Sequence, residues 1–233
     1  LMGATLPLLA EAISRRGLSA GKTVGLLYAT NTVGAVFGAA LVGFVLIPNL
    51  GVTRTNWVAV AIDLVIAAAL LIGWRFVGRH EVVDEEVAKM PAVLPTAVPG
   101  WMFLAAVGIS GGVAMALQVL WTRGLTVVLG SSTYAFTIIL VVFLTGLAGG
   151  ASLAGRFADR DRMPAFRLGI LIAGAGLFGF IGSRCIDQMP HWLQAFVVKP
   201  DLTIVELNLV QLTFCGLVML PATLLLGGVF PYV

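Results

Sequence analysis

Five polar residues interrupt long apolar stretches of the sequence: Asn31, Asp63, Gln118, Arg123 and Gln211. A charged side chain costs about 2.5 to 3.5 kcal/mol at the centre of a bilayer, so ionisable residues at that depth face a bundle interior or water. Asp63 would be protonated, paired with a base or in a wet cavity, whereas Arg123 could extend to a nearby membrane edge. The first four are candidates for an intramembrane polar site, either structural or lining a substrate or proton pathway.

No catalytic constellation accompanies these residues. The only histidines, His80 and His191, are expected in loops, which argues against paired haem ligation inside a bilayer. Cys185 and Cys215 lack the CxxC or Cys/His spacing of a zinc or redox site. The glycine-rich stretches lie in apolar segments, without the strand and acidic residue of a nucleotide fold. We therefore expect no catalytic residue, no metal and no cofactor in this segment.

The elements that must position the polar residues follow from the composition. Of the 233 residues, 59% are hydrophobic and only 11% are charged. A water-soluble globule could not cover its exterior with so few charged residues, so the chain is expected to lie in a membrane. The net charge of +3 does not indicate nucleic acid, because the basic residues form no single patch.

Charges and turn residues divide the chain into six nearly complete apolar spans and one partial span, since about 20 apolar residues cross a bilayer. Turns are expected at residues 48–51 and 130–132. A polar stretch leads to the last span and contains Asp187, His191, Lys199, Pro200 and Asp201. The predicted fold is an all-α polytopic transmembrane helix bundle. Its spans are 1–14 (partial), 22–47, 57–74, 101–130, 133–155, 168–183 and 206–228.

The basic residues indicate how these spans are oriented. Strict alternation puts ten of the 14 Lys and Arg residues on one side of the membrane and four, at 54, 123, 184 and 199, on the other. Cytoplasmic loops are enriched in Lys and Arg, so residues 79–98 and 156–167 are predicted to be cytoplasmic. The prolines at 91, 95 and 99 and the surrounding charges mark 79–98 as a linker.

A short internal repeat links the two ends of the chain. Leu1, Gly3 and Pro7 reappear with the same spacing as Leu225, Gly227 and Pro231, with six spans between equivalent points. A parallel repeat of six spans resembles the architecture of major facilitator transporters. On this interpretation residues 1–78 are the end of a first six-helix half (helix 4 in part, 5 and 6), 79–98 the linker, and 99–233 helices 1–4 of the second half.

The loop after the fifth span also resembles that superfamily. Gly155, Asp159 and Arg160 match its cytoplasmic loop motif between helices 2 and 3, in which an acid and a base follow a glycine by four and five residues. Residues 162–164 depart from the motif. Asp159 could cap a helix or pair with a base on a neighbouring helix. The alternative is that these charges only mark the cytoplasmic side.

Pairs of glycines four residues apart occur in three spans. Such a pair places both glycines on one helix face, where a partner helix can approach closely. The contacts are expected inside the bundle, with an outward-facing interface to another membrane protein as the alternative. The pairs are Gly34 and Gly38, Gly108 and Gly112, and Gly146 and Gly150.

Longer strings in the sequence resemble the membrane part of bacterial proteins that fuse a major facilitator domain to a spermidine-synthase-like domain. They are LMGATLPLLAEAI, GLLYATNTVGAVFGAALVGFVLIP and LQVLWTRGLTVVLGSSTYAFTIILVVFLTGLAGGASLAGRFADR. The resemblance covers residues 1–75 and about 100–167, and its most specific parts are 27–35, 121–123 and 130–135. Gln118 stands where that family often has an acid before the Trp-Thr-Arg string.

The resemblance implies a location in the bacterial cytoplasmic (inner) membrane. It also implies that this chain is a piece of a longer protein, in which a polyamine-related soluble domain follows and is anchored or served by these helices. None of that domain's binding or catalytic residues would lie here. Two alternatives remain: a small-molecule transporter whose cavity is lined by the four candidate polar residues, and a non-catalytic subunit that contacts membrane-protein partners through its glycine faces.

Overall fold

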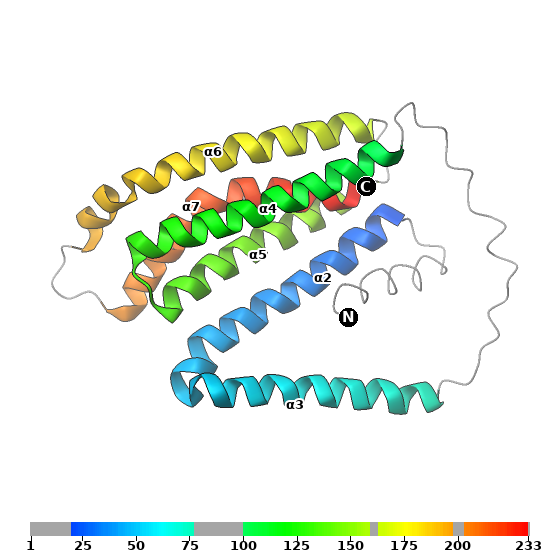
Figure 1. Ribbon diagram of the computed structural model, residues 1–233, viewed down its shortest axis with the longest axis horizontal. Coiled ribbons are helices and arrows are strands. Elements are labelled where there is room, and N and C mark those ends of the chain that lie inside the picture. The colour runs from blue at the N-terminus through cyan, green and yellow to red at the C-terminus, as the bar shows by residue number, and fades with distance from the viewer. Residues whose placement is uncertain (1–19, 77–99, 159–162, 198–202, 233) are drawn as a thin grey trace, which may run out of the picture. The chain divides into compact units, whose positions relative to one another are not determined.

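The computed structural model describes residues 20–76, 100–158, 163–197 and 203–232, and every element in these ranges is helical (Figure 1). This confirms the all-α prediction. The predicted partial span 1–14, the linker 79–98, Asp159 and Arg160 lie outside the described residues. The elements are α2 (Ala20–Leu41), the π-helix η1 (Val42–Leu46), α3 (Ile47–Phe76), α4 (Gly100–Leu129), α5 (Thr133–Gly155), α6 (Pro164–Val197), α7 (Ile204–Val229) and the 3₁₀ helix η4 (Phe230–Tyr232).

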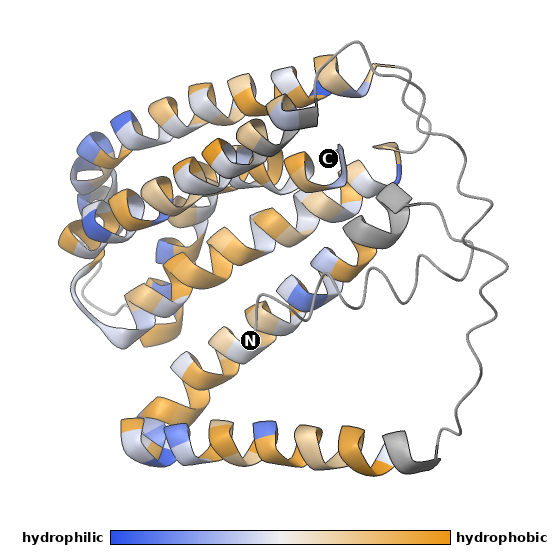
Figure 2. Ribbon diagram, turned by 45° about the vertical axis from the view of Figure 1, so that its right-hand side comes forward, coloured by the Kyte–Doolittle hydropathy of each residue, from blue (hydrophilic) through white to orange (hydrophobic). Residues whose placement is uncertain are grey.

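The described helices contain five stretches that are long and apolar enough to cross a membrane. In α6 and α7 the strongly hydrophilic residues lie towards the helix ends, and the segments between them are mostly hydrophobic (Figure 2). Because about 20 apolar residues span the hydrocarbon core, each stretch is sufficient in length. The stretches are Leu26–Gly73, Gly108–Leu129, Thr133–Gly155, Pro164–Trp192 and Ile204–Tyr232.

The chain forms two compact units. One comprises residues 1–40 and 96–233, and so contains most of α2 together with α4 to η4; the other comprises residues 41–95 and contains η1 and α3. Within the larger unit, α4, α5, α6 and α7 run in successively opposite directions, so the end of α5, the start of α6 and the end of α7 lie together (Figure 1).

In the smaller unit, the helical path is broken at Gly51. This residue has φ +74° and ψ 170°, whereas Pro48, Asn49 and Leu50 before it remain helical. Glycine adopts this positive φ without the steric cost that a Cβ would impose. Thr55 Oγ1 donates to the Gly51 carbonyl at 2.8 Å, which satisfies a backbone acceptor at the break. Of the turn predicted at 48–51, only Gly51 departs from helical geometry.

The reversal between α4 and α5 lies where the sequence predicted it. Gly130 has φ +89°, a conformation that favours glycine, and it ends α4 after Leu129. Ser132 is the N-cap of α5, and its hydroxyl accepts a hydrogen bond from the Ala135 backbone N–H at 3.1 Å. The predicted span 133–155 coincides with α5.

Helix α6 is much longer than the predicted span 168–183. It comprises 34 residues, which corresponds to roughly 50 Å and exceeds a hydrocarbon core of about 30 Å. The prediction that Asp187 and His191 lie in a polar loop is wrong, because both are exposed residues of α6. Polar side chains can stay solvated on a helix that continues beyond the apolar layer, and Pro190 is accommodated within it.

Helices α5 and α7 form the closest-packed pair in the described part of the chain. A Cβ at Gly146 would overlap the Thr223 side chain, and a Cβ at Gly150 would overlap the carbonyl of Leu224. In the other direction, a Cβ at Gly227 would overlap the Leu147 carbonyl. Helices that meet at backbone distance lose this contact if either surface gains a methyl group.

The three glycine pairs therefore have different surroundings. The predicted internal contact is confirmed for Gly146 and Gly150. At the pairs Gly34/Gly38 and Gly108/Gly112, a Cβ would meet nothing within 4 Å among the described residues. Whether another chain contacts these two faces stays a prediction.

We expect Gly150→Ala to lower the free energy of unfolding by about 1–3 kcal/mol, because the new methyl must push α7 away from α5. The matched control is Gly108→Ala, which adds the same methyl to an open helix face and should leave stability unchanged or slightly raised. Unfolding of both purified variants by denaturing detergent, followed by circular dichroism, measures the difference. Equal stability of the two variants would contradict the α5–α7 contact.

Candidate functional site

The structure places the four candidate polar residues on three helices. Asn31 is exposed on α2, and Asp63 is exposed on α3 in the other unit. On α4, Gln118 is half-buried and Arg123 is exposed. Gln118 and Arg123 are five positions apart, so they do not share a helix face. Whether the four residues line one cavity stays a prediction.

The buried face of α4 is formed by Trp121 and Leu125, which are both fully buried. They are four residues apart and so lie on one side of the helix, whereas Arg123 lies roughly 200° around the helix from Trp121. Trp121 Nε1 is buried and has no hydrogen-bond partner among the described residues. The sequence predicted Trp121 only as part of a family-like string. The i, i+4 spacing of Trp121 and Leu125 was the available signal for this face.

Gln211 connects α7 to the end of α4. Its side chain is buried, and its Nε2 donates to the carbonyl of Leu129 at 3.5 Å. Leu129 is the last residue of α4, where carbonyls have no partner within the helix. Gln211 Oε1 has no hydrogen-bond partner among the described residues. Of the five polar residues that interrupt apolar stretches, Gln211 therefore makes an interhelical contact, and the contact is structural.

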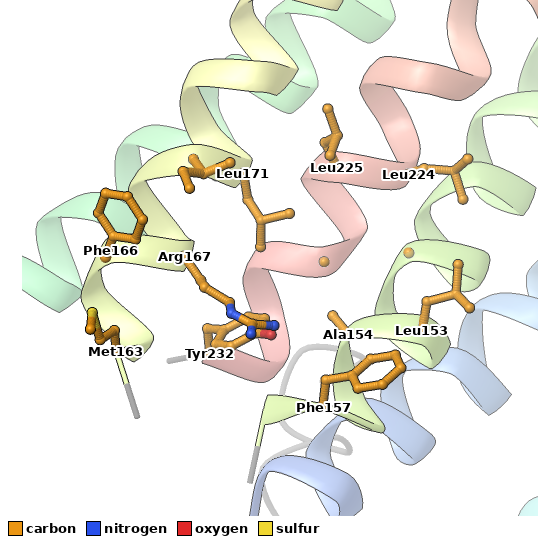
Figure 3. Close-up of a pocket in the computed structure, with 13 residues that line it drawn as sticks. Leu153, Ala154, Phe157, Met163, Phe166, Arg167, Leu171, Leu224, Leu225 and Tyr232 are labelled. Atoms are coloured by element: carbon orange, nitrogen blue, oxygen red, sulfur yellow. The ribbon is translucent and has the colours of Figure 1, made fainter. Parts of the chain in front are cut away.

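A cavity of about 770 Å³ lies where α5 ends, α6 begins and α7 ends. Its walls are mostly aliphatic and aromatic, and Arg167 is the one charged residue in its lining among those that the structure describes. Figure 3 shows the Arg167 side chain extending from α6 towards Tyr232, at the end of α7. The residues lining the cavity are Gly150, Leu153, Ala154, Phe157, Met163, Phe166, Arg167, Ile170, Leu171, Leu224, Leu225, Gly228 and Tyr232.

A second cavity, of about 560 Å³, lies between the opposite ends of α6 and α7. His191 and Trp192 contribute from α6, and the Trp192 ring stacks on Phe214 of α7 with 6.3 Å between ring centroids. Neither cavity is lined by any of the four candidate polar residues. These two cavities therefore give no support to the predicted polar pathway.

The predicted loop motif is only partly visible. Gly155 is buried and is the last residue of α5. In the described parts of the chain, no three His, Cys, Asp or Glu side chains are grouped in a way that could hold a metal ion. Comparison with family models, curated proteins and solved structures gave no match for this chain. The family resemblance thus depends on the sequence strings alone.

Replacing Gln211 with Leu should lower the free energy of unfolding by about 1 kcal/mol, because the carbonyl of the half-buried Leu129 loses its donor. Thr213→Val is the matched control on the same helix: Thr213 is exposed, and its hydroxyl donates to the Leu209 carbonyl of its own helix. Detergent-denaturation curves of the two variants give the comparison. A loss of the same size in both variants would show that Gln211 does not link α7 to α4.

Proposed function

We propose that this chain is the membrane-embedded part of a multi-pass protein, with helices in a major-facilitator-like order. The observation that supports this best is the apolar outer surface of the packed helices. Leu177 and Phe180 on α6 and Leu217 on α7 are 59%, 67% and 70% exposed. An exposed apolar surface spread along long helices is a liability in water, but in lipid it is the ordinary exterior of a bundle.

The span count fits this order. Leu26–Gly73 contains 48 residues, and a helix of that length would measure roughly 70 Å, more than twice the hydrocarbon thickness. The break at Gly51 divides this stretch into two parts that are each long enough to cross. Together with the other four stretches and the partial span 1–14, this supports about seven spans.

Contacts within the larger unit support the predicted orientation. The Tyr28 ring of α2 stacks on Phe230 of η4 with centroids 4.6 Å apart. Tyr28 follows Lys22 by six residues, and η4 lies at the end of α7, close to where α5 ends and α6 begins. The bases Lys22, Arg156 and Arg167 are therefore near the same end of this unit, as a cytoplasmic excess of Lys and Arg requires.

On this basis the chain serves as the membrane anchor of a spermidine-synthase-like fusion protein in the bacterial inner membrane. The most specific strings behind this resemblance have structural explanations here. Trp121 is fully buried, Gly130 has positive φ and Ser132 caps α5. These strings therefore encode packing and a turn, which suits an anchor and does not require a transported substrate.

The coding sequence beyond residue 233 tests the anchor hypothesis. We expect it to encode a soluble domain with a glycine-rich loop after a strand and an acid that binds ribose, as an adenosyl cofactor requires. A full-length gene that continues only into further apolar spans, or stops, would rule the fusion out. It would leave the membrane placement itself untouched.

Cysteine labelling tests the membrane placement. In a background with Cys185→Ser and Cys215→Ala, we expect Ser131→Cys to react with a membrane-impermeant maleimide in intact cells. Met163→Cys should react only after permeabilisation, because one membrane crossing separates it from the α4–α5 reversal. Both positions are exposed, so unequal burial does not account for a difference. Labelling of both positions from the same side would contradict a transmembrane α5.

A further inference from the structure

The larger cavity combines features that suit an amphiphile. It lies at the meeting point of three helix ends, which in a membrane-embedded bundle is the depth of the lipid headgroups. Phe166, Ile170 and Leu225 give it apolar walls, and Arg167 supplies one positive charge in the lining. Its volume of about 770 Å³ is within the ~300–1,000 Å³ typical of small-molecule sites.

The sequence at the connection from α5 to α6 is also basic. The sequence from 156 to 167 contains four arginines and two aspartates, a net charge of +2. Anionic lipids of the cytoplasmic leaflet are attracted to basic pockets between transmembrane helices. Guanidinium binds a phosphate through two parallel N–H···O bonds, which an ammonium cannot do.

We propose that this cavity is a binding site for an anionic phospholipid, with the headgroup phosphate on Arg167 and an acyl chain along the apolar wall. Ile170 and Leu171 follow Arg167 by one turn of α6, so the wall continues from the charge along the helix in the direction of the apolar core. Tyr232, towards which the Arg167 side chain extends, is an aromatic residue with a polar tip of the kind found at headgroup depth.

The chemistry favours lipid over a soluble anion or a second copy of the chain. A free phosphate would leave the large apolar part of the cavity empty. A second copy would have to cover Arg167 with an acidic surface, whereas the chain carries a net charge of +3. The proposal depends on the membrane placement, which the cysteine labelling tests separately.

Native mass spectrometry can measure lipid binding to the purified full chain after its release from detergent. The two lipids compared are phosphatidylglycerol and phosphatidylcholine with identical acyl chains. We expect Arg167→Gln to weaken binding of phosphatidylglycerol about tenfold. Binding of phosphatidylcholine should fall less, because its choline cation already offsets the attraction of its phosphate to the arginine. The control Arg184→Gln removes an exposed arginine from the same helix outside the cavity and should behave like the parent chain. Ile170→Trp, which fills the apolar wall, should weaken both lipids.

Three results would overturn the proposal. The first is equal binding of phosphatidylglycerol by the parent chain and Arg167→Gln. The second is displacement of that lipid by inorganic phosphate, which would indicate an anion site without an acyl chain. The third is a lipid-free dimer as the main species. Correct labelling topology together with any of these results would leave the proposed function standing and remove the lipid site alone.

Discussion

The structure depends on one interaction, the close contact between α5 and α7 at Gly146, Gly150 and Gly227. Lipid tails are as apolar as leucine, so helices in a bilayer gain little by hiding apolar side chains and associate instead through close van der Waals contact. Once α5 and α7 meet at this distance, α6 packs on α7 and α4 contacts all three. Thr223, fully buried at the contact, donates to the Met219 carbonyl in its own helix, so its hydroxyl has a hydrogen-bond partner there.

Signals that act locally were predictable from the sequence. Gly130 and Ser132 define the α4–α5 reversal through a positive φ and a side-chain cap, and both effects involve only neighbouring residues. The end of α6 was not predictable in this way. Asp187 and His191 were taken for a loop because they are polar, whereas a helix leaving the apolar layer has no reason to unwind. Polarity gives the depth of a residue and leaves its backbone conformation open.

The candidate polar site shows a second feature that the sequence could not predict. The sequence gives the position of Gln118, Arg123 and Gln211 along their helices, but not which face of α4 or α7 meets another helix. On α4 the buried face is that of Trp121 and Leu125, and α4 contacts α5, α6 and α7, which lie later in the sequence. Spacing also did not distinguish Gly150, which is pressed against Leu224, from Gly108, which has no neighbour within 4 Å among the described residues.

Arg167 contributes both to the predicted membrane orientation and to the lining of the larger cavity. In the sequence it is one of ten basic residues that indicate the cytoplasmic side. In the structure it lies on the first turn of α6, in the lining of a cavity made by the ends of three helices. A charge that fixes orientation must stay at the level of the headgroups, and there it meets the phosphates of the same leaflet. The orientation of the helices and the binding of a lipid would then both follow from the preference of Arg167 for the headgroup level. The apolar wall beside Arg167 would make the site selective for a lipid over a soluble anion.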